Sequence, residues 1–157
     1  MSRRSNPRAG FSLLELVIVI VIIGIIAAIA IPRMSRGAAG AADSALSGNL
    51  AVLRNAIDLY AAEHTGAYPK LATISDQLTK YSDHAGATSD TKDADHPYGP
   101  YVRAIPPLPV GADKGKTSFV GAYTAGNGWV YDEVNGTVTA NCADTEVDAT
   151  NKKYNAY

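Results

Sequence analysis

The chain has little cysteine, little tryptophan and no excess of positive charge. It contains 157 residues with one cysteine and one tryptophan, and its formal net charge is −1. Because the single thiol of Cys142 has no partner in the same chain, no intrachain disulfide can hold the fold together. The charge balance also lacks the basic excess that is typical of nucleic-acid-binding proteins, so no nucleic-acid partner is predicted.

The sequence also lacks the recurring motifs of catalytic and metal sites. No Ser-His-Asp set, P-loop or dinucleotide fingerprint is present. The three histidines, His64, His84 and His96, lie on different predicted elements without the spacing of a metal site. We therefore expect no enzymatic activity, no catalytic residue and no resident metal or other cofactor.

Charge is missing from a long segment near the N-terminus. No charged residue stands between Leu16 and Ile31, and the run is 21 residues long when counted from Phe11. At 1.5 Å per residue a helix of this length spans roughly 31 Å, close to the hydrocarbon thickness of a bilayer. The sequence therefore predicts one membrane-spanning helix over residues 11–32. The basic residues before it keep the N-terminus in the cytoplasm, namely Arg3, Arg4 and Arg8.

Glu15 is the one acid in this apolar segment. A carboxylate in the apolar layer costs on the order of 2.5–3.5 kcal/mol by insertion scales, and a plain anchor does not recover that cost. A filament subunit would recover it if a cation of a neighbour met the acid, and cleavage between Gly10 and Phe11 would create such a cation. Three interpretations follow: a plain anchor, a secretory signal cleaved after Ala28-Ile29-Ala30, and a processed filament subunit.

The segment GFSLLELVIVIVIIGIIAAIAIP, residues 10–32, resembles the N-terminal motif of type IV pilins and type II secretion pseudopilins. The residues that carry the resemblance are Gly10 before the cleavage site, Phe11 after it, Ser12, Glu15 as the fifth mature residue, and Gly24 and Pro32 at positions of helix flexibility. The resemblance implies that a prepilin peptidase removes the leader, residues 1–10, and methylates Phe11. It also implies that Glu15 pairs with the N-terminal amine of a neighbouring subunit and sets the register of assembly.

The resemblance implies an α+β, pilin-like fold in which a long N-terminal helix packs on a small antiparallel sheet of about three strands. It implies a structural subunit of a type IV pilus-like filament or a type II secretion pseudopilus. The precursor would be a single-pass protein of the bacterial inner membrane, and the filament would be periplasmic or extracellular. Expected partners are further copies of the chain, prepilin peptidase, an inner-membrane assembly platform with its ATPase, minor pilins or pseudopilins, and membrane lipid. The alternative is a monomeric anchored or secreted binding protein that uses the apolar segment only for export.

The segment after residue 32 has the periodicity of an amphipathic helix. Its apolar residues recur at spacings of four, three, four and three: Leu46, Leu50, Leu53, Ile57 and Tyr60. Gly66 and Pro69 end the pattern. The predicted organisation is a leader over residues 1–10, a membrane and filament-core helix over 11–32, a head helix over 33–66 and a globular head over 67–157.

Glycines and Pro32 lower the helix propensity between the two halves of this long helix. One hypothesis is that the helix melts locally between Gly24 and Gly40, which would let a filament stretch. The alternative is that the small residues allow close packing of neighbouring helices.

Helix, loop and strands follow in the predicted head. Helical spacing predicts a short helix over residues 71–81, and the polar segment 82–100 is predicted to be an exposed loop. The segments TSFVGAYTA, GWVYDEV and GTVTANC are predicted to form an antiparallel meander across Thr117 to Asn141, with Asn-Gly turns between the strands. Trp129 and Tyr131 should share one face of the sheet, with Val130 on the other.

The segments GPYV and IPPLP, residues 99–102 and 105–109, resemble major pseudopilins, in which a Pro-Trp-Gly-rich stretch near a calcium site usually follows. Here VGADKGK, residues 110–116, stands in that place. Two acidic groups are weaker candidates, the first for a cation site and the second for a calcium site that lacks the spacing of a known calcium loop. The first comprises Asp83, Asp90, Asp93 and Asp95 beside His84 and His96, and the second comprises Asp144, Glu146 and Asp148 with Asp132. Solvated acidic surface is the simpler interpretation of both groups.

Overall fold

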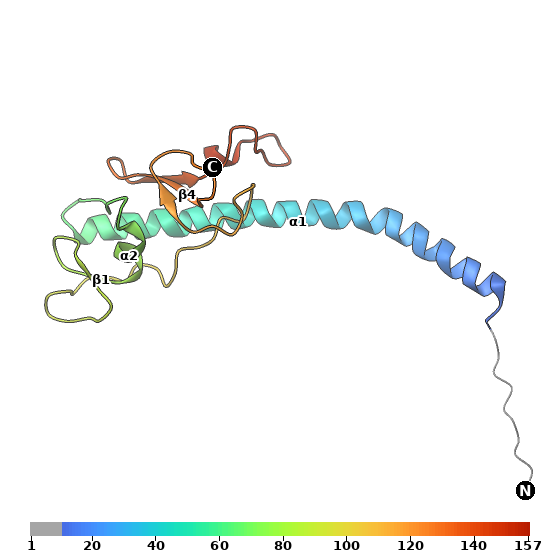
Figure 1. The fold of residues 1–157 in the computed structure, drawn as a ribbon, viewed down its shortest axis with the longest axis horizontal. Helices are drawn as coiled ribbons and strands as arrows, with labels where there is room; N and C mark the ends of the chain where they lie inside the picture. Colours follow the sequence, from blue (N-terminus) through green and yellow to red (C-terminus); the bar gives the residue numbers. More distant parts are fainter. Residues whose placement is uncertain (1–10) are drawn as a thin grey trace, which may run out of the picture. The chain divides into compact units, whose positions relative to one another are not determined.

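The computed structural model describes residues 11–157, except for the side chains of residues 31–39. The chain divides into two compact units, Met1–Ala38 and Ala39–Tyr157. Helix α1, Leu13–Glu63, contributes residues to both units (Figure 1). The expected leader and its last residue, Gly10, lie outside the described residues, and the domain boundaries proposed above stay predictions.

The first unit contains the apolar beginning of α1. Leu13–Ala30 is long and apolar enough to cross a membrane, and none of this segment is buried within the chain. Its large side chains are widely exposed, from 40% at Val17 to 80% at Leu13. Such a surface is unstable in water, so a bilayer or other apolar helices must cover it.

Helix α1 is continuous across Gly24, Pro32 and Gly40 in the isolated chain. Pro32 lies in the helix interior although it cannot donate a backbone hydrogen bond. Gly24 has open space where a Cβ atom would stand, so packing within the chain does not require glycine there. Melting between Gly24 and Gly40 concerns the filament and stays a prediction.

The second half of α1 supplies one side of the head core. The predicted apolar stripe is confirmed, because all five of its residues are at most 3% exposed: Leu46, Leu50, Leu53, Ile57 and Tyr60. The helix ends near the predicted residue, where the amide of Gly66 donates to the carbonyl of Ala61 at 2.7 Å. Thr65 and Gly66 have positive φ angles of 55° and 87°, as is typical of a Schellman-type helix end.

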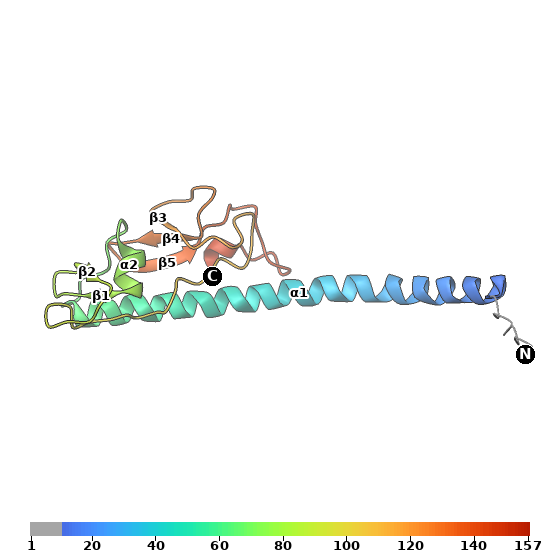
Figure 2. The same cartoon turned by 60° about the horizontal axis from the view of Figure 1, so that its bottom comes forward.

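A three-stranded sheet supplies the other side of the core (Figure 2). It consists of β3, Phe119–Val120, β4, Trp129–Asp132, and β5, Thr137–Ala140. The predicted alternation is confirmed, because Trp129 and Tyr131 are 0% and 1% exposed while Val130 is only partly covered. The polar atoms of both buried aromatics are satisfied: the Trp129 indole donates to the Pro106 carbonyl and the Tyr131 hydroxyl to the Pro69 carbonyl, each at 2.9 Å.

The prediction of an antiparallel meander is wrong for its first strand pair. Strands β4 and β5 are antiparallel, as expected, but β3 runs parallel to β4. The connection at residues 121–128 returns the chain to the start of β3 before β4 begins, and the buried side chain of Asn141 holds the connection in this conformation. The Asn141 amide donates to the carbonyls of Thr124 and Asn127, and its oxygen accepts from the Thr124 amide. Asn127-Gly128 is therefore part of a crossover and not a hairpin turn.

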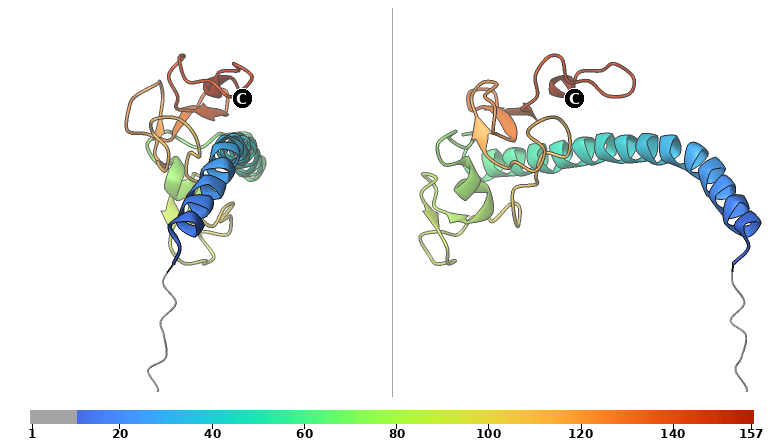
Figure 3. Two further views of the ribbon diagram at one scale, coloured as in Figure 1. Left: turned by 90° about the vertical axis from the view of Figure 1, so that its right-hand side faces the viewer. Right: turned by 45° about the vertical axis from the view of Figure 1, so that its right-hand side comes forward.

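The segment between α1 and the sheet forms two small elements. The predicted helix over 71–81 is confirmed as a shorter helix, α2, Ile74–Thr79. The polar segment after it contains a two-stranded antiparallel pair, β1, Tyr81–Ser82, and β2, Thr88–Ser89, which its composition did not predict. This pair lies near the C-terminal end of α1, as the right-hand view of Figure 3 shows.

The C-terminal segment is closed on itself and tied to α1 by polar contacts. It ends in a short 3-10 helix, η1, Tyr154–Ala156. The Lys153 ammonium pairs with the Asp144 carboxylate at 2.9 Å, and the Asn155 amide donates to the same carboxylate at 2.8 Å. Arg54 of α1 donates to the carbonyl oxygen of Tyr157 at 2.6 Å. Cys142 at the start of this segment is buried and unpaired.

Candidate functional site

The candidate assembly site is the first turn of α1, which is closed by a capping box. The hydroxyl oxygen of Ser12 accepts a hydrogen bond from the Leu14 amide at 3.3 Å. In return, the Ser12 amide donates to Oε2 of Glu15 at 2.9 Å. This reciprocal pair satisfies amides that a helix leaves unpaired at its start, and a carboxylate there also meets the positive end of the helix dipole.

The capping box gives Glu15 a role that the sequence analysis did not identify. The signal was present, because Ser12-Leu13-Leu14-Glu15 matches the Ser-x-x-Glu signature of a helix start. Either Glu or Gln can stand at the last residue of this box, because both side chains have an oxygen that accepts the hydrogen bond. The cap alone therefore does not need a negative charge. Capping explains why residue 15 has a side-chain oxygen that accepts a hydrogen bond. It does not explain why this residue is charged in an apolar segment.

Phe11 directly precedes Ser12, whose backbone amide donates to the Glu15 carboxylate. Its side chain is 83% exposed. Cleavage after Gly10 would make the backbone nitrogen of Phe11 a free amine next to the first turn. The structure therefore places the expected cation and the expected anion of the same chain at the same end of α1.

The N-terminal residues carry a known family signature. Residues 5–31 match the family described as the prokaryotic N-terminal methylation motif. The N-terminal segment of the chain therefore carries the motif of type IV pilin and pseudopilin precursors. The match covers residues 5–10 of the expected leader, the cleavage site and most of the apolar segment, and this motif points to a structural protein. No curated protein and no solved structure matches the chain.

The acids of the C-terminal calcium candidate each accept hydrogen bonds from separate groups. Glu146 accepts from the amides of Ala112 and Ala143 at 2.6 and 2.7 Å. Asp148 accepts from the Tyr157 hydroxyl and from Thr150, and these hydrogen bonds lower the pKa of its carboxyl. Hydrogen bonds from Asn135, Lys153 and their neighbours likewise lower the pKa values of Asp132 and Asp144.

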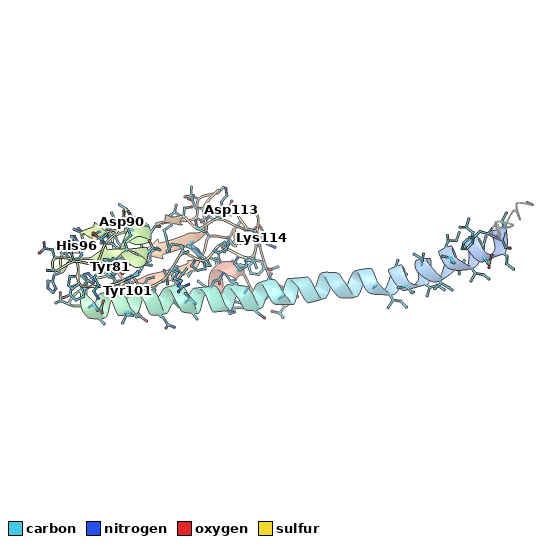
Figure 4. The ribbon with its side chains drawn as sticks, turned by 90° about the horizontal axis from the view of Figure 1, so that it is seen from below. Tyr81, Asp90, His96, Tyr101, Asp113 and Lys114 are labelled. Atoms are coloured by element: carbon cyan, nitrogen blue, oxygen red, sulfur yellow. The ribbon has the colours of Figure 1, made fainter. Side chains whose placement is uncertain are left out.

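The polar loop, where Figure 4 labels Asp90 and His96, also has acids that are engaged in separate contacts. Asp90 pairs with Lys80 at 3.1 Å, and Asp93 pairs with His96 at 2.8 Å. The hydrogen bond from His96 lowers the pKa of Asp93. Among residues 11–157, described as above, no three His, Cys, Asp or Glu side chains are grouped so as to hold a metal ion. Calcium binding stays a prediction that these contacts do not support.

His64 is a buried residue whose role the sequence analysis missed. It is 2% exposed, and its ring stacks on that of Tyr60 with centroids 3.8 Å apart. Its ring nitrogens contact the carbonyl oxygens of Tyr60 and Asp83 at 2.8 and 2.9 Å. Its spacing of four from Tyr60 and seven from Ile57 continues the apolar stripe, which is the signal that could have identified it. His64 thus ties the polar loop to the end of α1.

Proposed function

We propose that the mature chain is a structural subunit of a type IV pilus-like filament or type II secretion pseudopilus. The precursor is held in the bacterial inner membrane, and a prepilin peptidase cleaves it between Gly10 and Phe11. The assembly platform, its ATPase and minor pilins or pseudopilins then take part in polymerisation. The single observation that supports this function is the Glu15 carboxylate on the first turn of an exposed apolar helix, beside the nitrogen that cleavage would free.

The exposed apolar helix must be covered by an apolar layer both before and after assembly. A large apolar side chain contributes about 1.5–3 kcal/mol when it moves from water into an apolar environment. The bilayer covers these side chains in the precursor, and the helices of neighbouring copies cover them in a filament. Covering a few of them outweighs the cost of about 2.5–3.5 kcal/mol for placing a carboxylate in the same layer.

The pairing of Glu15 with a neighbour's Phe11 amine sets the type of assembly. Each subunit then carries one anion and one cation, at different positions of the same chain. A contact between two different surfaces of identical chains is heterologous, and repetition without closure produces an open helical filament. Methylation of the amine leaves it able to carry a positive charge, so it stays compatible with this pairing.

Mass spectrometry of the N-terminal peptide tests this function. The chain should be expressed with a prepilin peptidase, and both the membrane fraction and any sheared filament fraction should be digested. A peptide that begins at N-methylated Phe11 in the filament fraction supports the proposal. A peptide that begins at Ile31 would show ordinary signal cleavage and remove Glu15 from the mature protein. An intact N-terminus beside an active peptidase would show a plain membrane anchor.

A further inference from the structure

The head contains two Asn-Gly pairs, Asn127-Gly128 and Asn135-Gly136, in different environments. An asparagine followed by glycine is prone to deamidation, because no Cβ atom hinders attack by the glycine nitrogen on the asparagine side chain. We infer that Asn135 is a site of spontaneous deamidation in the folded protein, whereas the fold protects Asn127. This inference does not depend on filament assembly.

Asn135 lies in the exposed four-residue turn between β4 and β5. Its side-chain amide donates to Oδ2 of Asp132 at 2.6 Å, and its backbone amide donates to Oδ1 of the same carboxylate at 3.4 Å. Both bonds stay within the turn. The neighbouring Val134 is 79% exposed.

The turn touches the rest of the head through the residues on either side of Asn135: Glu133 accepts from the Leu71 amide at 2.6 Å, and the Tyr68 ring lies against Gly136. Deamidation at Asn135 therefore needs a movement of the turn beside Tyr68, but it breaks no side-chain bond between Asn135 and a distant residue.

Asn127 is held by groups from several parts of the head. The nitrogen of Gly128, which would be the nucleophile, is buried and donates to the Ser118 carbonyl at 3.0 Å. The Ser118 hydroxyl donates to Oδ1 of Asn127 at 2.8 Å. The Asn127 side chain also donates to Thr124, and its carbonyl accepts from Asn141 at 2.9 Å.

Reaction at Asn127 therefore needs a local opening that breaks these hydrogen bonds together. Each bond lowers the population of the open state by about twofold to tenfold.

The chemical step needs only water. The nitrogen of Gly136 bonds to Cγ of Asn135, the bond from Cγ to Nδ2 breaks, and ammonia leaves with the proton of the glycine amide. The product is a cyclic succinimide. Water then adds to one of its two carbonyl carbons and opens the ring, giving aspartate or isoaspartate at residue 135.

The modification would weaken the turn in which it occurs. It replaces the amide that donates to Asp132 with a second carboxylate beside the first, and two like charges then face each other. The isoaspartate form also adds a methylene group to the backbone between Asp132 and Thr137, which are paired across the hairpin. A larger separation at this pair loosens the end of the β4–β5 ladder.

The test is to incubate the purified protein in mildly alkaline buffer and to follow both residues by peptide mass spectrometry. A glutamate-specific protease cuts after Glu133 and so separates the two Asn-Gly pairs into different peptides. We expect Asn135 to deamidate at least about tenfold faster than Asn127 in the folded chain, since several hydrogen bonds protect Asn127. Equal rates in the folded chain, or faster loss at Asn127, would overturn the inference.

Two controls show whether the fold causes the difference. In denaturant both pairs lose their surroundings, so their rates should converge. A difference that persists in denaturant would mean that the local sequence and not the structure determines the rates, and it would overturn the protection assigned to Asn127. In the folded variant Ser118→Ala, which lacks the bond to Oδ1 of Asn127, the rate should rise at Asn127 and stay unchanged at Asn135.

Discussion

The substitution Glu15→Gln separates the two roles that the structure and the sequence give to this residue. A glutamine keeps the side-chain oxygen that accepts from the Ser12 amide, so the capping box remains. It removes the negative charge that would meet a neighbour's Phe11 amine. Glu15→Ala removes both the charge and the cap, and so provides the matched comparison.

The expected effects differ strongly in size. Loss of a carboxylate at a helix N-terminus costs less than about 1 kcal/mol, and α1 has 51 residues, so both variants should remain helical and enter the membrane. Loss of one partner of an ion pair buried in an apolar layer costs about 3–5 kcal/mol. Since 1.4 kcal/mol corresponds to a factor of ten, subunit association should weaken at least about 100-fold in either variant.

The assay is the amount of sheared filament that sediments from cells expressing the chain with its peptidase and assembly machinery. Cleavage after Gly10 must first be verified by mass spectrometry, because an uncut chain lacks the amine. Asp58→Asn, a loss of one exposed negative charge farther along α1, serves as a control and should assemble normally. If processed Glu15→Gln assembles like the unaltered chain while Glu15→Ala does not, Glu15 acts only as a cap and the charge-pairing argument fails.

Three further experiments test the head, two with substitutions and one with a thiol reagent. Leu53→Ala, at a core position that is 0% exposed, should lower the free energy of unfolding by about 2–5 kcal/mol in denaturant titration, and a change below 1 kcal/mol would contradict the assigned core. Burial, reinforced by Glu146, raises the pKa of the Cys142 thiol to about 12, so an alkylating reagent at neutral pH should label only unfolded protein. The hydrogen bond from Tyr157 lowers the pKa of Asp148 in the folded protein below the unfolded value of about 3.9. The ionised Asp148 therefore stabilises the fold above about pH 3.9, and this stabilisation is lost as the pH falls through the lower pKa of the folded state. Asp148→Asn should accordingly reduce the acid sensitivity of unfolding, and an unchanged pH profile would refute this link.

The sequence predicted those parts of the fold that depend on local periodicity. The stripe from Leu46 to Tyr60 and the alternation of Trp129 and Tyr131 follow from the repeats of a helix and a strand, and both are buried as expected. The four-residue turn before Thr137 also follows from local residues, since Asn135-Gly136 is a strong turn signal. At the N-terminus, the apolar run and the motif around Glu15 were sufficient to predict the match to the N-terminal methylation motif.

The parts that were missed depend on contacts between distant residues. The parallel pairing of β3 with β4 is fixed by Asn141, which acts on residues 14 to 17 positions earlier in the chain. No local pattern encodes that contact, and Asn127-Gly128 taken alone indicated a hairpin. The strands β1 and β2 have two residues each, which is too short for alternation to be visible. The placement of His64 against Asp83 likewise depends on how the polar loop returns to α1.

The polar attachment of the C-terminal segment has a consequence for where the head can fold. Its closing contacts are the ion pair of Lys153 with Asp144, the hydrogen bonds of Asn155 and the bond from Arg54 to Tyr157, and none of them involves sulfur. The head can therefore reach its native state without a thiol-oxidising enzyme, in a reducing or an oxidising compartment alike. A reductant that opens disulfide-linked heads would leave this one closed, whereas high salt would weaken its exposed ion pair.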